Sequence, residues 1–100
     1  MNTFDVHLLG SDAGETIPGV LSFVGEDASG SFGLLAHHVR FMTVLAFGLA
    51  RLRLVDGRTR YVGLPGGLLY FVDNALWLST RRYLVGDDAA VLGETLAQQV

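Results

Sequence analysis

The chain has 100 residues, of which half are hydrophobic, and this length is typical of one domain with a single core. It has no cysteine and a net charge of −3, which excludes disulfides and thiolate metal sites and argues against broad nucleic-acid binding. No uncharged stretch approaches the ~18 residues that a membrane helix needs, and the N-terminus lacks a signal-peptide pattern, so we expect a soluble cytoplasmic protein without direct membrane insertion.

Alternation of apolar and polar residues with a period of two runs through most of the chain and predicts β-strands. The first strand is expected over Phe4 to Leu9, and the second over Thr16 to Val24. Pro18 has no amide hydrogen to donate, so we expect a bulge or an edge there. A short strand over Ser31 to Leu35 follows.

Asp56 and Gly57 form a dipeptide that favours a two-residue type I′ turn between strands. Such a turn pairs Arg53 with Arg60 and predicts a surface on which four arginines share one face. The members of this surface are Arg51, Arg53, Arg58 and Arg60. Because like charges opposed across strands repel, the surface would favour an anionic or carboxylate partner. The alternative is ordinary solvated arginines whose aliphatic stems cover the sheet.

A second turn is expected at Asp73-Asn74 and pairs Tyr70 with Trp77. This register points Leu69, Phe71, Leu76 and Leu78 inward. It places Tyr70, Val72 and Trp77 on the opposite face, either as an interface or as the inside of a more closed barrel. Many short strands at this spacing predict a mainly β fold, an antiparallel sandwich or barrel.

The hydrophobic period changes after Gly86, and residues 86–100 are predicted to contain one short helix. Asp87 and Asp88 suit a helix N-terminus. Leu92, Leu96 and Val100 form an apolar stripe at four-residue spacing.

Three histidines are the candidates for metal or acid–base chemistry, but their positions do not define a site. His37 and His38 are adjacent, so on a strand their side chains would point to opposite faces. Both could bind one ion only in a loop, and nothing in the spacing brings His7 to them. The sequence therefore favours a structural or interface role for the pair, and we expect no catalytic residue, metal or cofactor.

The segment from Gly30 to His38 resembles the G-x-L-G-I-L-P-G-H pattern of the epsilon subunits of rotary F-type ATP synthases, with Ala36 and His37 in place of Pro-Gly. The segments 4–9, 48–54 and 66–69 resemble further strands of that family in the same order. Ser79 to Arg82 is closer to the epsilon subunits of an alternative, sodium-type branch of these ATPases.

The resemblance implies an antiparallel β-sandwich of about ten short strands over residues 1–85, followed by the start of a helical region over residues 86–100. It implies a non-catalytic rotor subunit in the central stalk, on the cytoplasmic face of the bacterial inner membrane, that couples the membrane c-ring to the gamma subunit and the catalytic head. By resemblance, the gamma-facing residues are His38, Thr43 and Gly10, and the c-ring-facing residues are Gly30 and Ser31.

Two departures from the family pattern qualify this expectation. The family's inhibitory helical hairpin is absent or truncated in residues 86–100. The ATP-binding motif (I/L)-D-x-x-R-A aligns with Leu92 to Ala97, where Gly93 replaces the acid and Leu96 the arginine, so we expect no nucleotide binding.

Tyr70, Val72 and Trp77 replace positions that are commonly polar in the family, which predicts an unusually apolar partner-facing surface and makes self-association plausible. Two alternatives remain open at this stage. One is a small metal-dependent β-barrel enzyme that uses His7, His37 and His38. The other is a β-sandwich adaptor whose arginine face binds an acidic protein or RNA.

Overall fold

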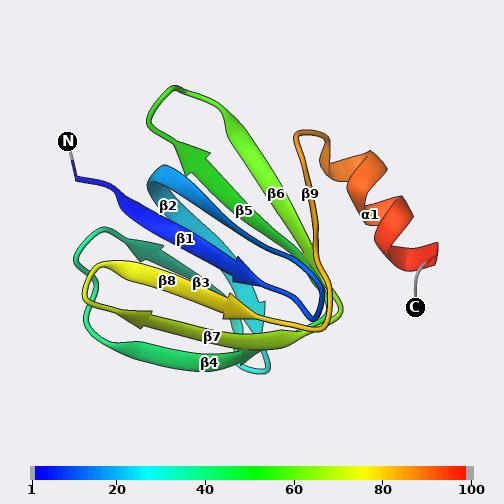
Figure 1. Cartoon of the computed structure of the whole chain (residues 1–100), viewed down its shortest axis with the longest axis horizontal. Helices are drawn as coiled ribbons and strands as arrows, with labels where there is room; N and C mark the ends of the chain where they lie inside the picture. The colour runs from blue at the N-terminus through cyan, green and yellow to red at the C-terminus, as the bar shows by residue number, and fades with distance from the viewer. Residues whose placement is uncertain (1, 99–100) are drawn as a thin grey trace.

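A computed structural model describes residues 2–98, which form nine strands and one helix (Figure 1). The elements are β1 (Phe4–Leu9), β2 (Gly14–Asp27), β3 (Gly30–Leu35), β4 (Phe41–Leu45), β5 (Gly48–Leu54), β6 (Thr59–Leu64), β7 (Gly67–Val72), β8 (Ala75–Ser79), β9 (Leu84–Gly86) and α1 (Ala89–Gln98). The predicted mainly β fold with one C-terminal helix is confirmed.

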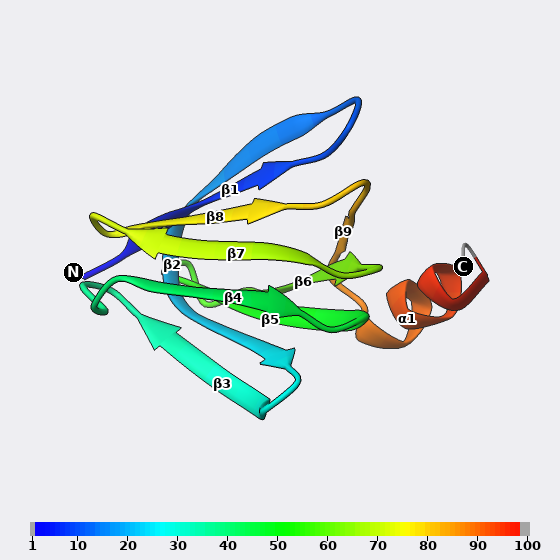
Figure 2. The same cartoon turned by 90° about the horizontal axis from the view of Figure 1, so that it is seen from below.

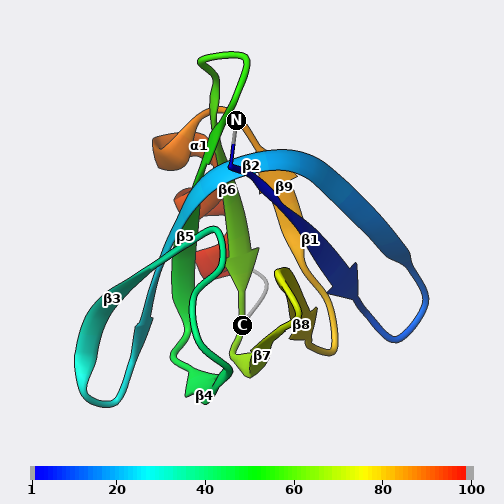
Figure 3. The ribbon, with the colours of Figure 1, turned by 90° about the vertical axis from the view of Figure 1, so that its left-hand side faces the viewer.

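The strands form two facing layers that share the long strand β2 (Figures 1 and 3). The first half of β2 pairs with β1, and its second half pairs with β3 and β5. One layer continues from β1 through β8 and β7 to β4, and the other from β5 through β6 to β9. All pairings are antiparallel except that of β1 with β8, which is parallel.

The core lies between the layers and is built from the inward residues of each strand. Phe4, Val6 and Leu8 of β1 are buried, as their alternation predicted, and so are Phe23 and Phe71. Each fully buried side chain of this size contributes about 1.5–3 kcal/mol to folding. Hydrophobic burial therefore provides most of the stability of the fold.

The long strand β2 bends at Pro18 and Gly19, where a bulge was expected. Its pairing with β1 shifts register between Phe4↔Val20 and Val6↔Ile17, and Gly19 has a φ of +67°. The strand is also longer than the predicted Thr16 to Val24, because Gly25 to Asp27 continue to pair with β3.

The two predicted hairpins differ in outcome. At Asp73-Asn74 both residues have positive φ, as a type I′ turn requires, and Tyr70 pairs with Trp77 as predicted. The predicted register at Asp56-Gly57 is wrong by one residue, because Arg53 pairs with Thr59. The loop has three residues rather than two, since the Leu54 amide bonds the Arg58 carbonyl at 2.9 Å.

This one-residue shift moves side chains to the other face of β6. Arg60 lies opposite Leu52, on the inner side of the layer, whereas Arg51 and Arg53 lie on the outer side. The four arginines therefore do not share a face. The predicted four-arginine surface is therefore wrong. This surface was the observation that favoured an adaptor for acidic proteins or RNA, so that alternative loses its support.

The helix α1 begins where the sequence predicted. The Asp88 carboxylate accepts the amides of Ala90 and Val91 at 3.0 and 3.1 Å, which makes it the N-cap. Leu92 and Leu96 are buried, and a Cβ added at Gly63 of β6 would lie only 3.4 Å from Leu96. The glycine thus lets α1 pack closely at one end of the sandwich (Figure 2). Val100, the third member of the predicted stripe, lies outside the described residues.

Candidate docking surface

The outer side of β4, β7 and β8 carries a cluster of exposed and half-buried apolar side chains, which we call the apolar face. It consists of Met42, Val44, Leu68, Tyr70, Val72 and Trp77. Met42 pairs with Tyr70 and Tyr70 pairs with Trp77, so these three form one row across the strands. Met42 is 58% exposed, Val44 68% and Leu68 44%.

No charged side chain occupies an outward position on these three strands, because the remaining outward residues are Ala75 and Ser79. Scattered apolar residues are normal on a protein surface, but a contiguous cluster marks an interaction site. The predicted placement of Tyr70, Val72 and Trp77 away from the core is what the registers show. The additional members, Met42 and Val44, were not predicted. Their alternation with Phe41 and Thr43 nevertheless indicates that they share one face of a strand.

His7 lies at one rim of the apolar face. It pairs with Trp77 across the parallel β1–β8 ladder, and the two rings stack with centroids 4.1 Å apart and an interplanar angle of 23°. Its Nδ1 lies 2.9 Å from the Thr16 hydroxyl on β2. These contacts restrict the orientation of the His7 ring, and through the stacking that of Trp77, at this rim.

The tip of the β2–β3 hairpin, which includes Gly30 and Ser31, is held by the Asp27 carboxylate. Asp27 accepts hydrogen bonds from the Ser29 amide at 2.9 Å, from the Ser29 hydroxyl, and from the Thr43 hydroxyl of β4 at 2.7 Å. The hydrogen bonds from Ser29 and Thr43 lower the pKa of Asp27 below its ordinary value of 3.8. The tip is therefore a fixed, anionic corner at the end of β4.

The three residues expected to face gamma do not form one cluster. His38 precedes β4 and packs edge-on against Phe41 and Phe71, with ring centroids 5.9 and 6.0 Å away. Gly10 follows β1 at the opposite end of that layer, where its amide bonds the Ala13 carbonyl at 2.8 Å. Thr43 is linked to the hairpin tip, because its hydroxyl donates a hydrogen bond to the Asp27 carboxylate. The apolar face occupies the strands between these points.

His37 lies in the β3–β4 turn, and the contacts that it makes there were not predicted from the sequence. It adopts a φ of +66°, at the position where the family pattern has glycine. Its amide donates to the Asn74 side-chain oxygen at 2.7 Å, and the Asn74 amide group donates to the Thr3 carbonyl at 2.9 Å. Asn74 thus connects the β3–β4 turn, the β7–β8 turn and the start of β1.

The histidines therefore occupy two environments, the rim of the apolar face and the β3–β4 turn. Within residues 2–98 there is no group of three or more histidine, cysteine, aspartate and glutamate side chains that could hold a metal ion. Over the same residues, no helix is long and apolar enough to cross a membrane.

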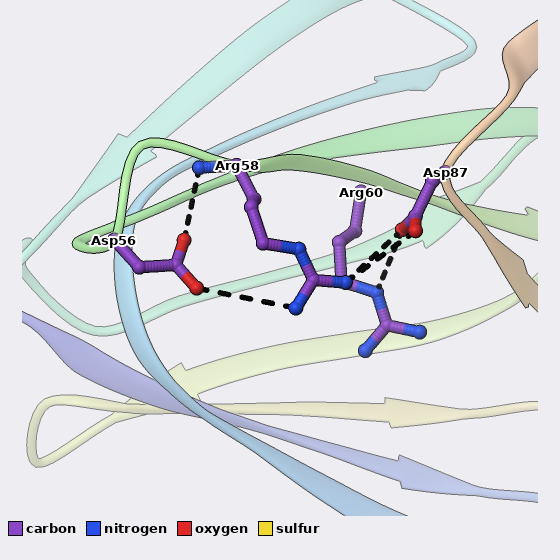
Figure 4. Close-up of polar contacts among 4 residues, drawn as sticks. All are labelled: Asp56, Arg58, Arg60 and Asp87. Carbon is purple, nitrogen blue, oxygen red and sulfur yellow. Dashed lines mark hydrogen bonds and ion pairs between the residues drawn. The ribbon is translucent and has the colours of Figure 1, made fainter.

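Two of the four candidate arginines take part in an ionic cluster that joins β6 to the start of α1 (Figure 4). Asp87 lies 3.4 Å from the Arg58 Nη2 and 3.3 Å from the Arg60 Nε. The Arg60 Nε is buried and its contact lacks hydrogen-bond geometry, so the attraction is mainly Coulombic. Asp56 accepts the Arg58 backbone amide at 2.9 Å. We call Arg58, Arg60 and Asp87 the ionic clasp.

The sequence did not predict the clasp, because Asp87 was interpreted only as part of a helix start. Likewise, Asp27 lies outside the strands that the sequence predicts. A signal for the Asp27 network was present, since an aspartate two residues before a serine in a turn commonly bonds its backbone amide.

Together these features define a class of protein: a β-sandwich with a fixed hairpin tip and an apolar face on the outer side of β4, β7 and β8. Residues 18–83 match the sequence model of the family described as "ATP synthase, Delta/Epsilon chain, beta-sandwich domain". Because this match covers more than half of the chain, the protein belongs to that family.

Relatives agree with the family match. The chain is 37% identical over 82 residues to "ATP synthase epsilon chain 2" of Cereibacter sphaeroides, over 81% of this chain and 56% of that protein. The chain thus spans about half the length of this curated relative.

Two solved structures have a similar fold. A chain of the Euglena gracilis mitochondrial ATP synthase aligns with a TM-score of 0.77 and 19% identity, over 98% of this chain and 64% of its own length. A chain of the central stalk and c-ring of the Tetrahymena thermophila enzyme aligns with a TM-score of 0.67 and 15% identity, over 84% and 69%.

Proposed function

We propose that this protein is a non-catalytic subunit of the central stalk of an F-type ATP synthase, equivalent to the epsilon subunit. In this role it turns with the rotor and couples the c-ring to the gamma subunit and the catalytic head. It would be a peripheral subunit on the cytoplasmic face of the bacterial inner membrane. The observation that supports the proposal is the uncharged apolar face on the sandwich of this particular family.

We propose that the apolar face is the gamma-binding surface and that His38, Thr43 and Gly10 lie around it. A protein partner that covers these exposed side chains removes apolar area from water, which is worth about 25 cal/mol per Å². Since the outward residues of β4, β7 and β8 carry no charge, little desolvation penalty opposes this burial.

The hairpin tip at Gly30 and Ser31 is proposed to contact the polar loops of the c-ring. Asp27 and Ser29 fix the shape of this tip by hydrogen bonds, and a fixed loop loses less conformational entropy on binding. The two contact regions lie on different parts of the sandwich, so one subunit could bind gamma and the ring at the same time.

Co-purification tests this proposal. An affinity-tagged copy expressed in its native host should recover gamma and the c-ring from detergent-solubilised membranes in constant ratio. A tagged protein that elutes from those membranes without ATP synthase subunits, although folded, would contradict the stalk role. An unrelated tagged β-sandwich, processed in the same way, controls for non-specific recovery.

A further inference from the structure

The strand β3 has a hydrogen-bonding edge that no other described strand occupies. It pairs with β2 from Ser22↔Leu35 to Asp27↔Gly30, and within residues 2–98 it belongs to no other ladder. Figure 3 shows β3 at the border of its layer, with no strand on its outer side. The backbone amide and carbonyl groups on such an edge are a template for pairing with another chain.

This edge lacks the features that usually protect an edge strand. The sequence Gly-Ser-Phe-Gly-Leu-Leu contains no charge and no proline, and Leu35 is 64% exposed. In contrast, β9 at the far border of the layer has only three residues. It is also packed against α1. Of the two border strands of this layer, β3 therefore has the more exposed edge.

Gly33, in the middle of β3, is a glycine that the fold does not require. A Cβ at this position would have the Phe23 carbonyl oxygen, 3.7 Å away, as its nearest neighbour. This is an ordinary contact, and Gly33 is not among the residues with positive φ. At Gly25 and Gly67, by comparison, an added Cβ would lie 2.8 and 2.6 Å from existing atoms.

Glycine weakens a strand, so an interior glycine without a reason in its own fold indicates a place where another backbone or ligand approaches closely. The space above Gly33 lies on the outer side of the layer, because Gly33 pairs with Val24, which pairs with Arg51. Ser31 and Leu35 are its outward neighbours on β3.

We propose that the free edge of β3 accepts an extended strand from a partner polypeptide, which adds to the layer beside β3. The strand would be uncharged where it faces β3, and it would place a large apolar side chain beside Gly33. Aromatic and β-branched residues commonly cover a glycine on the neighbouring strand. This surface is separate from the apolar face, and it adjoins the hairpin tip, because Gly30 and Ser31 are the first residues of β3. The proposal rests on the free edge and on Gly33, and it does not depend on the stalk role.

A second copy of this chain fits the edge less well than a different partner. A two-fold pairing centred on Gly33 would set glycine against glycine and leave the space above both unfilled. A pairing centred on Leu34 would set Leu35 against Gly33, but it would pair only residues 33–35 of the two strands, because β3 ends at Leu35. The partner is therefore expected to be another polypeptide.

The first test substitutes Gly33→Val in the isolated protein. If the fold does not need this glycine, the β-branched residue should hold or raise the midpoint of thermal unfolding, by up to about 4 °C for a domain of this size. Gly25→Val is the matched control and should lower the midpoint, because its added Cβ would meet Phe23 at 2.8 Å. A fall in the unfolding midpoint of Gly33→Val comparable to that of the Gly25→Val control would overturn the argument from Gly33.

The second test measures strand addition directly with the probe peptide acetyl-Lys-Thr-Val-Tyr-Val-Thr-Lys-amide. At millimolar peptide, alternate backbone amides of β3 should exchange with deuterium at least tenfold more slowly, and those of β6 should not change. The same peptide N-methylated at every residue between the two lysines should have no effect, because neither of its edges can then donate. Unchanged exchange in β3 with both peptides would overturn the proposal. Sedimentation as a dimer with β3 protected in the absence of peptide would overturn the assignment to a different partner.

Discussion

The ionic clasp predicts how removal of a single charge changes the stability of the junction between β6 and α1. In the Asp87→Asn variant the attraction to both Arg58 and Arg60 is lost. The Arg58 pair is exposed at both partners, with side-chain exposures of 55% and 63%, and such pairs contribute about 0.2–1 kcal/mol. Arg60 is only 26% exposed, but its Nε makes no hydrogen bond, so the variant removes from this pair only a Coulombic attraction of about 0.5–1 kcal/mol.

Since Asp87 itself is well hydrated, solvent screening keeps both attractions small, and we expect a total loss of about 1 kcal/mol in the free energy of unfolding. Urea denaturation followed by circular dichroism measures this loss as a lower midpoint with an unchanged slope. The difference between wild type and variant should shrink in 1 M salt, where the screening length falls to about 3 Å.

Asp56→Asn is the matched control for this variant. Its carboxylate lies 4.0 Å from the Arg58 Nη1, and an asparagine oxygen can still accept the Arg58 amide, so its loss should stay below about 0.5 kcal/mol. Equal losses for Asp87→Asn and Asp56→Asn would refute the reasoning, because they would show that the contact with Arg60 does not stabilise the junction.

Three further predictions concern the turns, the hairpin tip and the helix. Asn74→Ala should lower the free energy of unfolding by about 2–3 kcal/mol, since it removes two hydrogen bonds and strains a residue with positive φ; Asn74→Gly, which tolerates that φ, should lose about 1 kcal/mol less in the same urea titration. The pKa of Asp27 is lower in the folded than in the unfolded protein, so the charged carboxylate stabilises the fold fully above the unfolded pKa of 3.8, and this stabilisation is lost as the pH falls through the folded pKa. The urea midpoint should therefore depend less steeply on acid pH in Asp27→Asn than in the wild type. An identical dependence in the two proteins would count against the Asp27 network. Calorimetry with millimolar ATP should show no binding, since Gly93 and Leu96 occupy the acid and arginine positions of the family motif; a saturable heat would contradict this.

Local patterns in the sequence predicted those parts of the fold that depend on neighbouring residues. The alternation of β1 and the type I′ turn at Asp73-Asn74 are local features, and both were confirmed. The register at Asp56-Gly57 was wrong because Asp-Gly fits both a two-residue turn and a three-residue loop with the glycine at positive φ. A shift of one residue then changed the predicted face of the arginines.

The contacts between distant segments were not predictable from local pattern. Asp27 meets Thr43, and Asp87 meets Arg58 and Arg60, only because the layers bring their strands together. The apolar face was predicted in part, since Tyr70 and Trp77 follow from one hairpin. Its extension to Met42 and Val44 depends on the pairing of β4 with β7, which no turn specifies.

The measurement that tests the central claim most directly is the affinity of the Tyr70→Ser/Trp77→Ser variant for purified gamma subunit, compared with its thermal stability. Both residues lie on the apolar face, so the account predicts at least a tenfold loss of affinity with an unfolding midpoint close to that of wild type. Arg53→Ser, on the outer side of the other layer, is the matched control and should bind gamma as wild type does. Wild-type affinity in the double variant, with its fold intact, would contradict the assignment of the apolar face as the gamma-binding surface.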